Sequence, residues 1–294
     1  MRLAHAIDTF STYLHANQRS PHTVACYQRD LRGLARFAGD PHVADLTHEL
    51  LHAYVVSDAV QNKPDGQPRA QATVNRGKAA LRSFGSWLVM TGAAQRNPAE
   101  GLDIRRADRQ SPSTFTEPER KRMLREVHAH KGDAATRDSM MLDLLLGTGI
   151  RLAELVGLDC DDVDLDRKRI TIRAKGGHDE TRFLNAYLRQ WLRRYLRHRN
   201  QADSDSPALF LSNRGTRISR RQVQARFRLW LQWAGIDRPG LSVHSTRHTF
   251  GTRLYRKTHD LLLVGKAMGH RTVEATAIYV HADDEALEEA LEAL

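Results

Sequence analysis

Cysteine and long apolar segments are both scarce in this sequence. The 294 residues include only two cysteines, Cys26 and Cys160, which are far apart and lack the spacing of metal ligands. We expect two unpaired thiols in a reducing compartment rather than a disulfide framework or a zinc site. There is no secretory signal, and no apolar run approaches the roughly 18 residues of a membrane span. We therefore expect a chain that is neither exported nor membrane-spanning.

The motifs of two common kinds of phosphate chemistry are also missing. The sequence has no cluster of carboxylates for catalytic metal ions and no Gly-x-x-x-x-Gly-Lys loop for the phosphates of a nucleotide. The fifteen histidines are scattered, and none forms a zinc-type cluster with cysteine. We expect a protein that uses no metal and no cofactor, and that works without ATP.

Basic side chains outnumber acidic ones. There are 45 Lys and Arg against 35 Asp and Glu, a formal net charge of +10. The last segment, residues 283–294, holds six acidic side chains and no basic one, so the rest of the chain is more basic than the total suggests. Such a charge favours a polyanion, above all nucleic acid, as the partner.

Residues 1–102 have the pattern of a helical bundle. Apolar periodicity predicts helices at residues 3–16, 21–38, 47–60 and 71–90, with no strand signal between them. Ser20 followed by Pro21 is a typical helix start, and Gly39 is a typical helix end. The length also predicts two domains. Residues 103–115, polar and rich in arginine, are the best candidate for the linker between them.

Residues 116–294 combine helices with short strands. Helices are predicted at residues 116–130, 134–147, 186–199 and 219–234, and an acidic one at 283–294. Between them, the runs 163–165, 169–172 and 181–184 have a strand-like period, and a glycine-flanked turn at Lys175 joins the last two. We expect a mainly α protein with a small antiparallel β-sheet (α+β), built from a four-helix N-terminal domain and a larger C-terminal domain.

Polar residues suited to phosphate chemistry gather near the C-terminus. His244 and Arg247 are three residues apart, and positions i and i+3 share one face of a helix. His270 follows, and Tyr279 lies nine residues beyond it. Arginine binds phosphate oxygens through two donors, histidine transfers protons near neutral pH, and a tyrosine hydroxyl can be a nucleophile. Each signal is weak alone, because a His-x-x-Arg pair is usually a solvated helix face.

A second motif upstream strengthens this interpretation. The run Gly149-Ile-Arg151-Leu-Ala-Glu154 supplies another arginine, and arginine is always charged and matches a phosphate edge. Glu154 could hold the guanidinium of Arg151, although an ordinary surface pair is the alternative. These motifs, with Lys175, His244, Arg247, His270 and Tyr279 in that order, resemble the tyrosine recombinases, also called the phage integrase family. The domain sizes resemble its Xer-like members.

The resemblance implies a site-specific recombinase with a core-binding (SAM-like) domain at residues 1–102 and a catalytic domain at 116–294. It implies catalytic roles for Tyr279, Arg151, Lys175, His244, Arg247 and His270, with Glu154 in support. Tyr279 would attack the phosphate and give a 3′-phosphotyrosine and a free 5′ hydroxyl, with Lys175 as general acid. His244 would assist proton transfer and His270 would bind the phosphate. Neighbouring cations should lower the pKa of Tyr279 from its usual value near ~10.

The partner implied is double-stranded DNA with inverted-repeat recombination sites. Candidates for contacts with the DNA backbone are Arg76, Lys78, Arg82, Arg105, Arg106, Arg220 and Arg221. We expect a homotetramer on synapsed DNA, held by the C-terminal helix, acting in the cytoplasm at the nucleoid. The acidic helix at residues 283–294 has an apolar stripe, so it should dock on protein, either its own domain or a neighbour.

Two other functions use the same residues. A type IB topoisomerase would relax DNA as a monomer with the same tyrosine, arginine and histidine chemistry. A catalytically inactive DNA-binding regulator is the weaker alternative, because every expected catalytic residue type is present. The sequence leaves open the target DNA and whether the element served is a phage, a transposon, an integron or a replicon that resolves its dimers.

Overall fold

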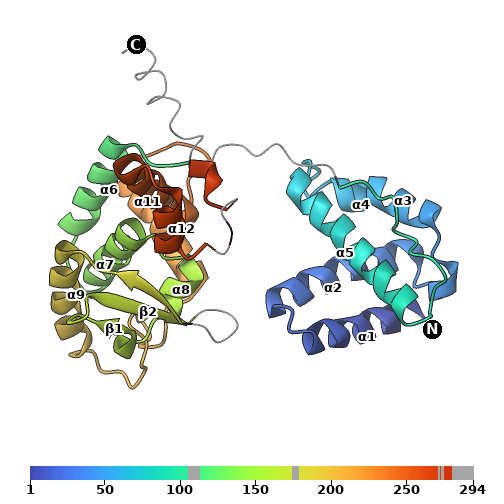
Figure 1. Ribbon diagram of the computed structural model, residues 1–294, viewed down its shortest axis with the longest axis horizontal. Coiled ribbons are helices and arrows are strands. Elements are labelled where there is room, and N and C mark those ends of the chain that lie inside the picture. The colour runs from blue at the N-terminus through green and yellow to red at the C-terminus, as the bar shows by residue number, and fades with distance from the viewer. Residues whose placement is uncertain (105–112, 174–178, 271, 273–274, 280–294) are drawn as a thin grey trace, which may run out of the picture. The chain divides into compact units, whose positions relative to one another are not determined.

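The chain divides into two units between Arg109 and Gln110 (Figure 1). The computed structural model describes residues 1–104, 113–173, 179–270, 272 and 275–279. The division falls within residues 103–115, the predicted linker. That assignment stays a prediction, because Arg105, Arg106 and the rest of 105–112 lie outside the described residues. The predicted fold class, mainly helical with a small antiparallel sheet, is confirmed.

All the regular elements in the described part of the first unit are helices. Its elements are α1 (Leu3–Ala16), α2 (Pro21–Ala38), η1 (Val43–Asp45), α3 (His48–Val56), α4 (Asp58–Gln61) and α5 (Gln71–Met90). Ser20 caps α2 by accepting a hydrogen bond from the Thr23 N–H at 3.0 Å. The single helix predicted over residues 47–60 is wrong, because the extended backbone of Ser57 separates α3 from α4. The rings of Phe10, Phe84 and Trp87 meet at its centre.

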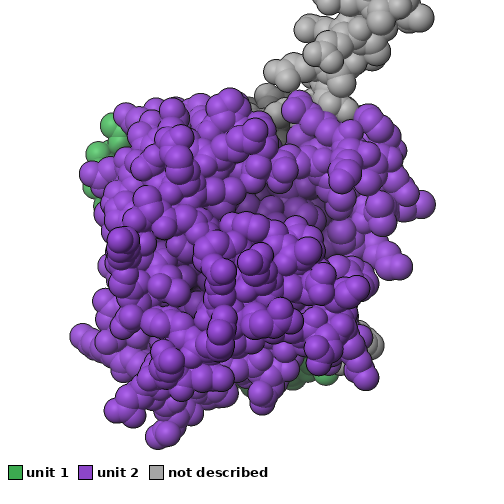
Figure 2. Space-filling model, turned by 90° about the vertical axis from the view of Figure 1, so that its left-hand side faces the viewer, with its two compact units in different colours: residues 1–109 green, residues 110–294 purple. Residues whose placement is uncertain are grey.

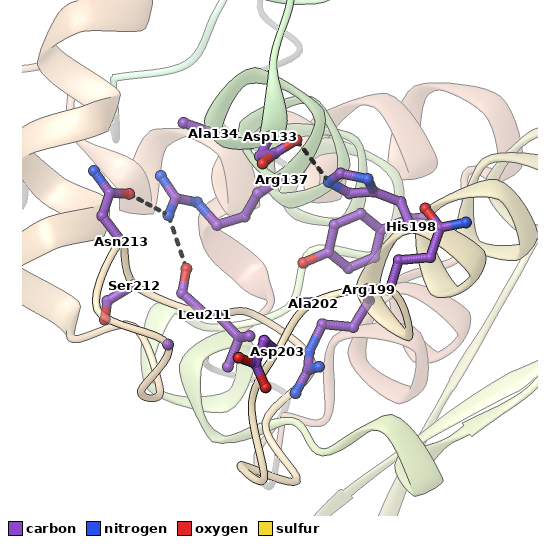
Figure 3. Close-up of a pocket in the computed structure, with 13 residues that line it drawn as sticks. Asp133, Ala134, Arg137, His198, Arg199, Ala202, Asp203, Leu211, Ser212 and Asn213 are labelled. Carbon is purple, nitrogen blue, oxygen red and sulfur yellow. Dashed lines mark hydrogen bonds and ion pairs between the residues drawn. The ribbon is translucent and has the colours of Figure 1, made fainter.

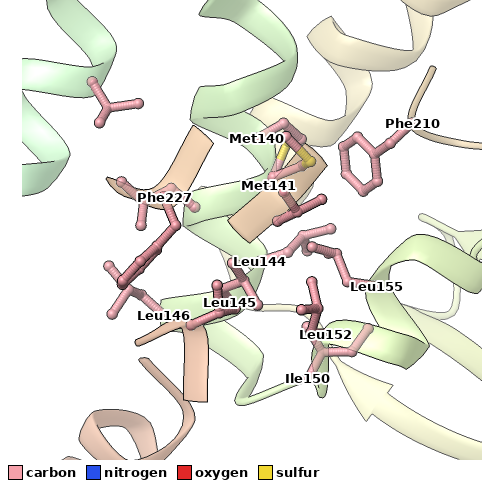
Figure 4. Packing of buried hydrophobic residues seen from close by; sticks show 14 of the residues in the cluster. Met140, Met141, Leu144, Leu145, Leu146, Ile150, Leu152, Leu155, Phe210 and Phe227 are labelled. Carbon is pink, nitrogen blue, oxygen red and sulfur yellow. The ribbon is translucent and has the colours of Figure 1, made fainter. Parts of the chain in front are cut away.

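The second unit surrounds one central helix. Its helices are α6 (Glu117–Ala129), α7 (Asp133–Thr148), α8 (Leu152–Gly157), α9 (Ala186–Arg199), α10 (Arg220–Trp233), α11 (Val243–Thr258) and α12 (Leu261–Met268), with 3₁₀ turns η2 (Cys160–Asp162) and η3 (Ala277–Tyr279). In α7, Met141, Leu142, Leu144 and Leu145 are fully buried (Figure 4). Figure 2 shows the surface of this unit in purple. No helix in the described ranges is long and apolar enough to cross a membrane.

A three-stranded antiparallel sheet lies beside these helices. Its strands are β1 (Val163–Asp164), β2 (Arg169–Arg173) and β3 (Asp179–Phe183), in the order β1-β2-β3. Ile170 of β2 pairs with Arg182 of β3, and the side chains of both are buried. The turn predicted at Lys175 falls in residues 174–178, outside the described part of the chain.

A glycine turn after α7 lies against α11 and leads to the site. Gly149 has a positive φ of 62°, and a Cβ there would lie 2.5 Å from Cδ1 of Phe250 in α11. Any other residue at this position would have a strained backbone, and its Cβ would displace the Phe250 ring or the helix that carries it. The turn leads directly to Arg151, which is the N-cap residue of α8.

Candidate active site

Arg151 and Glu154 form an ion pair at the start of α8. Nη1 of Arg151 lies 2.5 Å from Oε1 of Glu154, and Oε2 accepts a hydrogen bond from the Arg151 backbone N–H at 2.9 Å. Nη2 of Arg151 donates to the carbonyl oxygen of Gly269 at 3.2 Å. The Glu154 side chain is only 14% exposed, whereas that of Arg151 is 38% exposed. The pair is therefore more than a surface contact, and it leaves the guanidinium accessible.

Arg247 is a neighbour of Arg151 and is buried. It donates to the carbonyl oxygens of Gly149 and Met268, each at 2.6 Å. Burial, and then the charge of Arg151, lower the pKa of Arg247 to about 10. The guanidinium is still charged at neutral pH. Because Arg247 and Arg151 bind the carbonyls of adjacent residues, the two guanidiniums converge on one turn.

Tyr279 is buried beside this turn, with 1% of its surface exposed. Its ring is stacked on His270, with centroids 6.2 Å apart and an interplanar angle of 10°. Gly251 provides the space, because a Cβ there would lie 2.6 Å from Cζ of Tyr279. Burial raises the pKa of Tyr279 to about 12, although Arg247 and Arg151 act in the opposite direction. The predicted lowering of this pKa is wrong for the free protein, because desolvation outweighs the nearby cations.

His270 directly follows the turn that the two arginines hold. Its Nδ1 lies 2.8 Å from Oγ1 of Thr276. Burial, and then the charges of Arg247, Arg151 and Arg182, lower the pKa of His270 to about 4. The ring is therefore neutral at physiological pH. When Nδ1 accepts from Thr276, the proton is on Nε2, which can donate to a phosphate oxygen.

Sequence reasoning missed His248, which contacts the tyrosine directly. Its Nδ1 lies 3.3 Å from the hydroxyl oxygen of Tyr279. Burial, and then His244 and Arg247, lower the pKa of His248, so the neutral ring can accept a proton. His248 follows Arg247 and lies one turn beyond His244 on α11. The i, i+4 spacing puts His244 and His248 on one face of the helix, and this was the sequence signal that could have identified His248.

The two remaining predicted catalytic residues are His244 and Lys175. His244 is exposed at the start of α11, and no described hydrogen bond joins it to Arg247 or Tyr279. It is close enough to His248 to lower the pKa of that ring. Lys175 lies outside the described residues, between Arg173 at the end of β2 and Asp179 at the start of β3. Their catalytic roles stay predictions.

The candidate DNA-contacting residues fall into two groups. Arg76 donates to both carboxylate oxygens of Asp30, at 2.9 and 3.3 Å, and Nζ of Lys78 donates to the Asp103 carbonyl at 2.7 Å. These two residues have partners within the first unit. The other described candidates, Arg82, Arg220 and Arg221, are exposed. Arg220 and Arg221 begin α10, where positive charge opposes the helix dipole, an arrangement that a bound phosphate would stabilise.

A pocket of about 590 Å³ lies elsewhere in the second unit (Figure 3). None of the predicted catalytic residues lines it. Arg137 donates there to the Leu211 carbonyl at 2.7 Å and to Oδ1 of Asn213 at 3.1 Å, and Arg199 donates to the Ala208 carbonyl at 3.0 Å. These arginines hold a loop to α7 and α9, so we assign the pocket a structural role. The described residues contain no group of three or more His, Cys, Asp or Glu side chains arranged to hold a metal ion.

Comparison with known proteins agrees with this fold. Residues 113–286 match the model of the phage integrase family, and residues 7–92 match the phage integrase N-terminal SAM-like domain. Tyrosine recombinase XerC of Serratia marcescens is 35% identical over 282 residues, which is 96% of this chain and 91% of that protein. Tyrosine recombinase XerC of Vibrio cholerae serotype O1 is 33% identical over 285 residues, 96% of this chain and 89% of that protein.

A solved structure shares the fold at lower identity. The XerH site-specific recombinase, in a post-cleavage complex with a palindromic difH substrate, has a TM-score of 0.77 and 21% identity, covering 91% of this chain and 78% of that one. Fold and site define an enzyme of the tyrosine recombinase class, a site-specific recombinase that cuts and rejoins DNA. The chain belongs to the phage integrase family. The relatives favour this function over the topoisomerase and the inactive regulator.

Proposed function

We propose that Tyr279 is the nucleophile of this recombinase and that Arg151 and Arg247 bind the phosphate it attacks. The observation that carries the proposal is the position of the two arginines, which bind the carbonyls of Gly269 and Met268 beside the buried tyrosine. The non-bridging oxygens gain negative charge in the transition state, and two preorganised guanidiniums stabilise that charge.

In the proposed reaction the Tyr279 oxygen forms a bond to phosphorus as the bond to the 5′ oxygen breaks. The tyrosine proton passes to Nδ1 of His248, which lies 3.3 Å from the hydroxyl oxygen. The leaving oxygen takes up a proton to become a free 5′ hydroxyl. Lys175 is the proposed donor of that proton, with His244 assisting, and His270 donates to a phosphate oxygen. The phosphodiester is exchanged for a 3′-phosphotyrosine, so rejoining needs no ATP.

The described conformation suits an enzyme that is inactive until DNA binds. Tyr279 is buried with a raised pKa, so its hydroxyl is neither exposed nor ionised at neutral pH. We therefore propose that DNA binding exposes the tyrosine hydroxyl.

The DNA partner is proposed to carry inverted-repeat sites that four protomers bring together. The palindromic substrate of the XerH structure supports the inverted repeats, and the exposed Arg82, Arg220 and Arg221 support contact with the DNA backbone. Residues 283–294, which lie outside the described part, are acidic and are expected to dock on a neighbouring protomer rather than on DNA. The proposed location is the cytoplasm, at the nucleoid, where such DNA is found.

A nicked suicide substrate tests the proposed chemistry. Cleavage close to the nick releases a short 5′-hydroxyl fragment that diffuses away, so the protein stays covalently bound to the 3′ phosphate. We expect a covalent band on a denaturing gel, at the same rate with and without EDTA. Absence of the band on a site that the protein binds would contradict the proposal. Loss of the band in EDTA, restored by magnesium, would show that a metal takes part.

A further inference from the structure

Arg182 is a buried charged residue that no sequence motif assigned. It is the second-to-last residue of β3, with 2% of its side chain exposed, and lies opposite the fully buried Ile170 of β2. A strand position that faces the interior normally holds an apolar side chain. Burying a guanidinium there is unfavourable unless its donors find acceptors. The acceptors that Arg182 finds therefore show what it contributes.

The Nη2 atom of Arg182 contacts the turn formed by Met268 and Gly269, which precedes His270. It donates to Oε2 of Glu180 at 2.8 Å and to the carbonyl oxygen of Met268 at 3.2 Å. It also lies 3.6 Å from Oε2 of Glu154, the carboxylate that holds Arg151. Arg182 thus contacts two parts of the site, the turn before His270 and the acid that orients Arg151.

Three arginines hold the same two-residue turn from three directions. The carbonyl oxygen of Met268 accepts from Arg182 and from Arg247, and that of Gly269 accepts from Arg151. The three come from β3, α11 and the N-cap of α8. Their shared acceptors fix the turn relative to the guanidiniums that are proposed to bind phosphate.

Gly269 packs directly on the Glu180 and Arg182 side chains. Its φ is 63°, and a Cβ there would lie 2.0 Å from Oε2 of Glu180 and 2.7 Å from Nη2 of Arg182. Only glycine combines this left-handed backbone with so close an approach. The contact leaves the turn little freedom to move away from β3.

We propose that Arg182 is a positioning residue of the recombination site. It holds the turn that carries His270 against β3 and keeps Glu154 in place beside Arg151. Since β3 begins only four residues after Lys175, the same contact couples the strand that follows Lys175 to the surroundings of Tyr279. This inference rests on the proposed roles of Arg151, Arg247 and Tyr279.

The variant R182M tests the inference, because methionine fills much of the same space without a charge or a donor. We expect covalent-complex formation in a single turnover to slow by about ten- to hundredfold, the effect of a small misplacement of catalytic groups. Affinity for an intact site should stay within about twofold of wild type, because Arg182 is buried and many exposed cations contact the DNA. A gel shift and a thermal melt accompany the rate measurement.

Two matched variants complete the experiment. R182K keeps the charge but lacks the two-pronged geometry of the guanidinium, so its rate should lie between those of R182M and wild type. R169M removes an arginine of β2 that is 37% exposed and lies 3.8 Å from Asp164, and it should cleave at the wild-type rate.

A wild-type rate for R182M, or an affinity loss that equals its rate loss, overturns the inference. Should R182M fail to fold, R182K decides: a slower rate at unchanged affinity supports positioning, and a wild-type rate overturns it. Failure of wild-type protein to form the covalent complex would instead refute the proposed function itself.

Discussion

The hydroxyl oxygen of Tyr279 lies 3.3 Å from Nδ1 of His248, within the same buried cluster as His270. Both histidines have lowered pKa values and are neutral at physiological pH, and burial raises the pKa of the tyrosine. A phenol in such surroundings does not ionise at neutral pH. The free protein thus keeps the proposed nucleophile in an unreactive form.

The two arginines should contribute to the transition state far more than to DNA affinity. We expect Arg151→Ala and Arg247→Ala each to slow cleavage by at least about a hundredfold, the usual effect of losing a preorganised donor. Binding should weaken much less. Arg173→Ala, which removes a side chain that is 72% exposed, is the control. Near wild-type single-turnover cleavage by either site variant would show that its arginine is structural.

Gly251 should keep the tyrosine in its buried position. Gly251→Ala places a Cβ 2.6 Å from Cζ of Tyr279 and 2.8 Å from Sδ of Met268, so one of them must move. We expect a lower melting temperature and faster nitration of Tyr279 without DNA, measured by peptide mass spectrometry. Gly157→Ala meets nothing within 4 Å and should change neither. Unchanged nitration in Gly251→Ala would mean that Tyr279 is not held by this contact.

His270 should make the fold sensitive to acid. Its folded pKa of about 4 lies below the unfolded value near ~6.5, so the unfolded chain binds more protons between these values. The stability is fully present above about pH 6.5 and is lost as pH falls toward 4. We expect His270→Gln to flatten the fall in melting temperature across this window. Identical pH curves for variant and wild type would contradict the assigned pKa.

Periodicity predicted most of the helices and the three strands, and motif order pointed to Arg151, Glu154, Arg247, His270 and Tyr279, which the fold brings together. Both signals depend on local spacing, which the sequence contains. It could not predict the direction of the Tyr279 pKa shift, which depends on how deeply the fold buries the ring. His248 and Arg182 were missed for a related reason. Their importance comes from contacts across α11, β3 and the turn before His270, and only the folded chain defines those contacts.

The acidic segment 283–294 should control assembly. We expect its deletion to preserve binding to a single site but to abolish cooperative binding to paired sites and recombination. The double change Leu287→Ala and Leu291→Ala keeps all six acidic charges and should have the same effect, which separates docking from charge. A two-site gel-shift titration beside a melting curve measures both. Unchanged cooperativity with a lower melting temperature would mean that the segment packs on its own domain.

Trapping on a nicked suicide substrate tests the central claim, that Tyr279 is the nucleophile. The covalent complex is digested with nuclease and protease, and mass spectrometry locates the residue that carries the nucleotide. The account predicts a nucleotide-linked peptide that contains Tyr279, and no covalent complex from Tyr279→Phe, which should still bind the site with wild-type affinity. A nucleotide attached to any other residue, or trapping of the phenylalanine variant, would contradict the account.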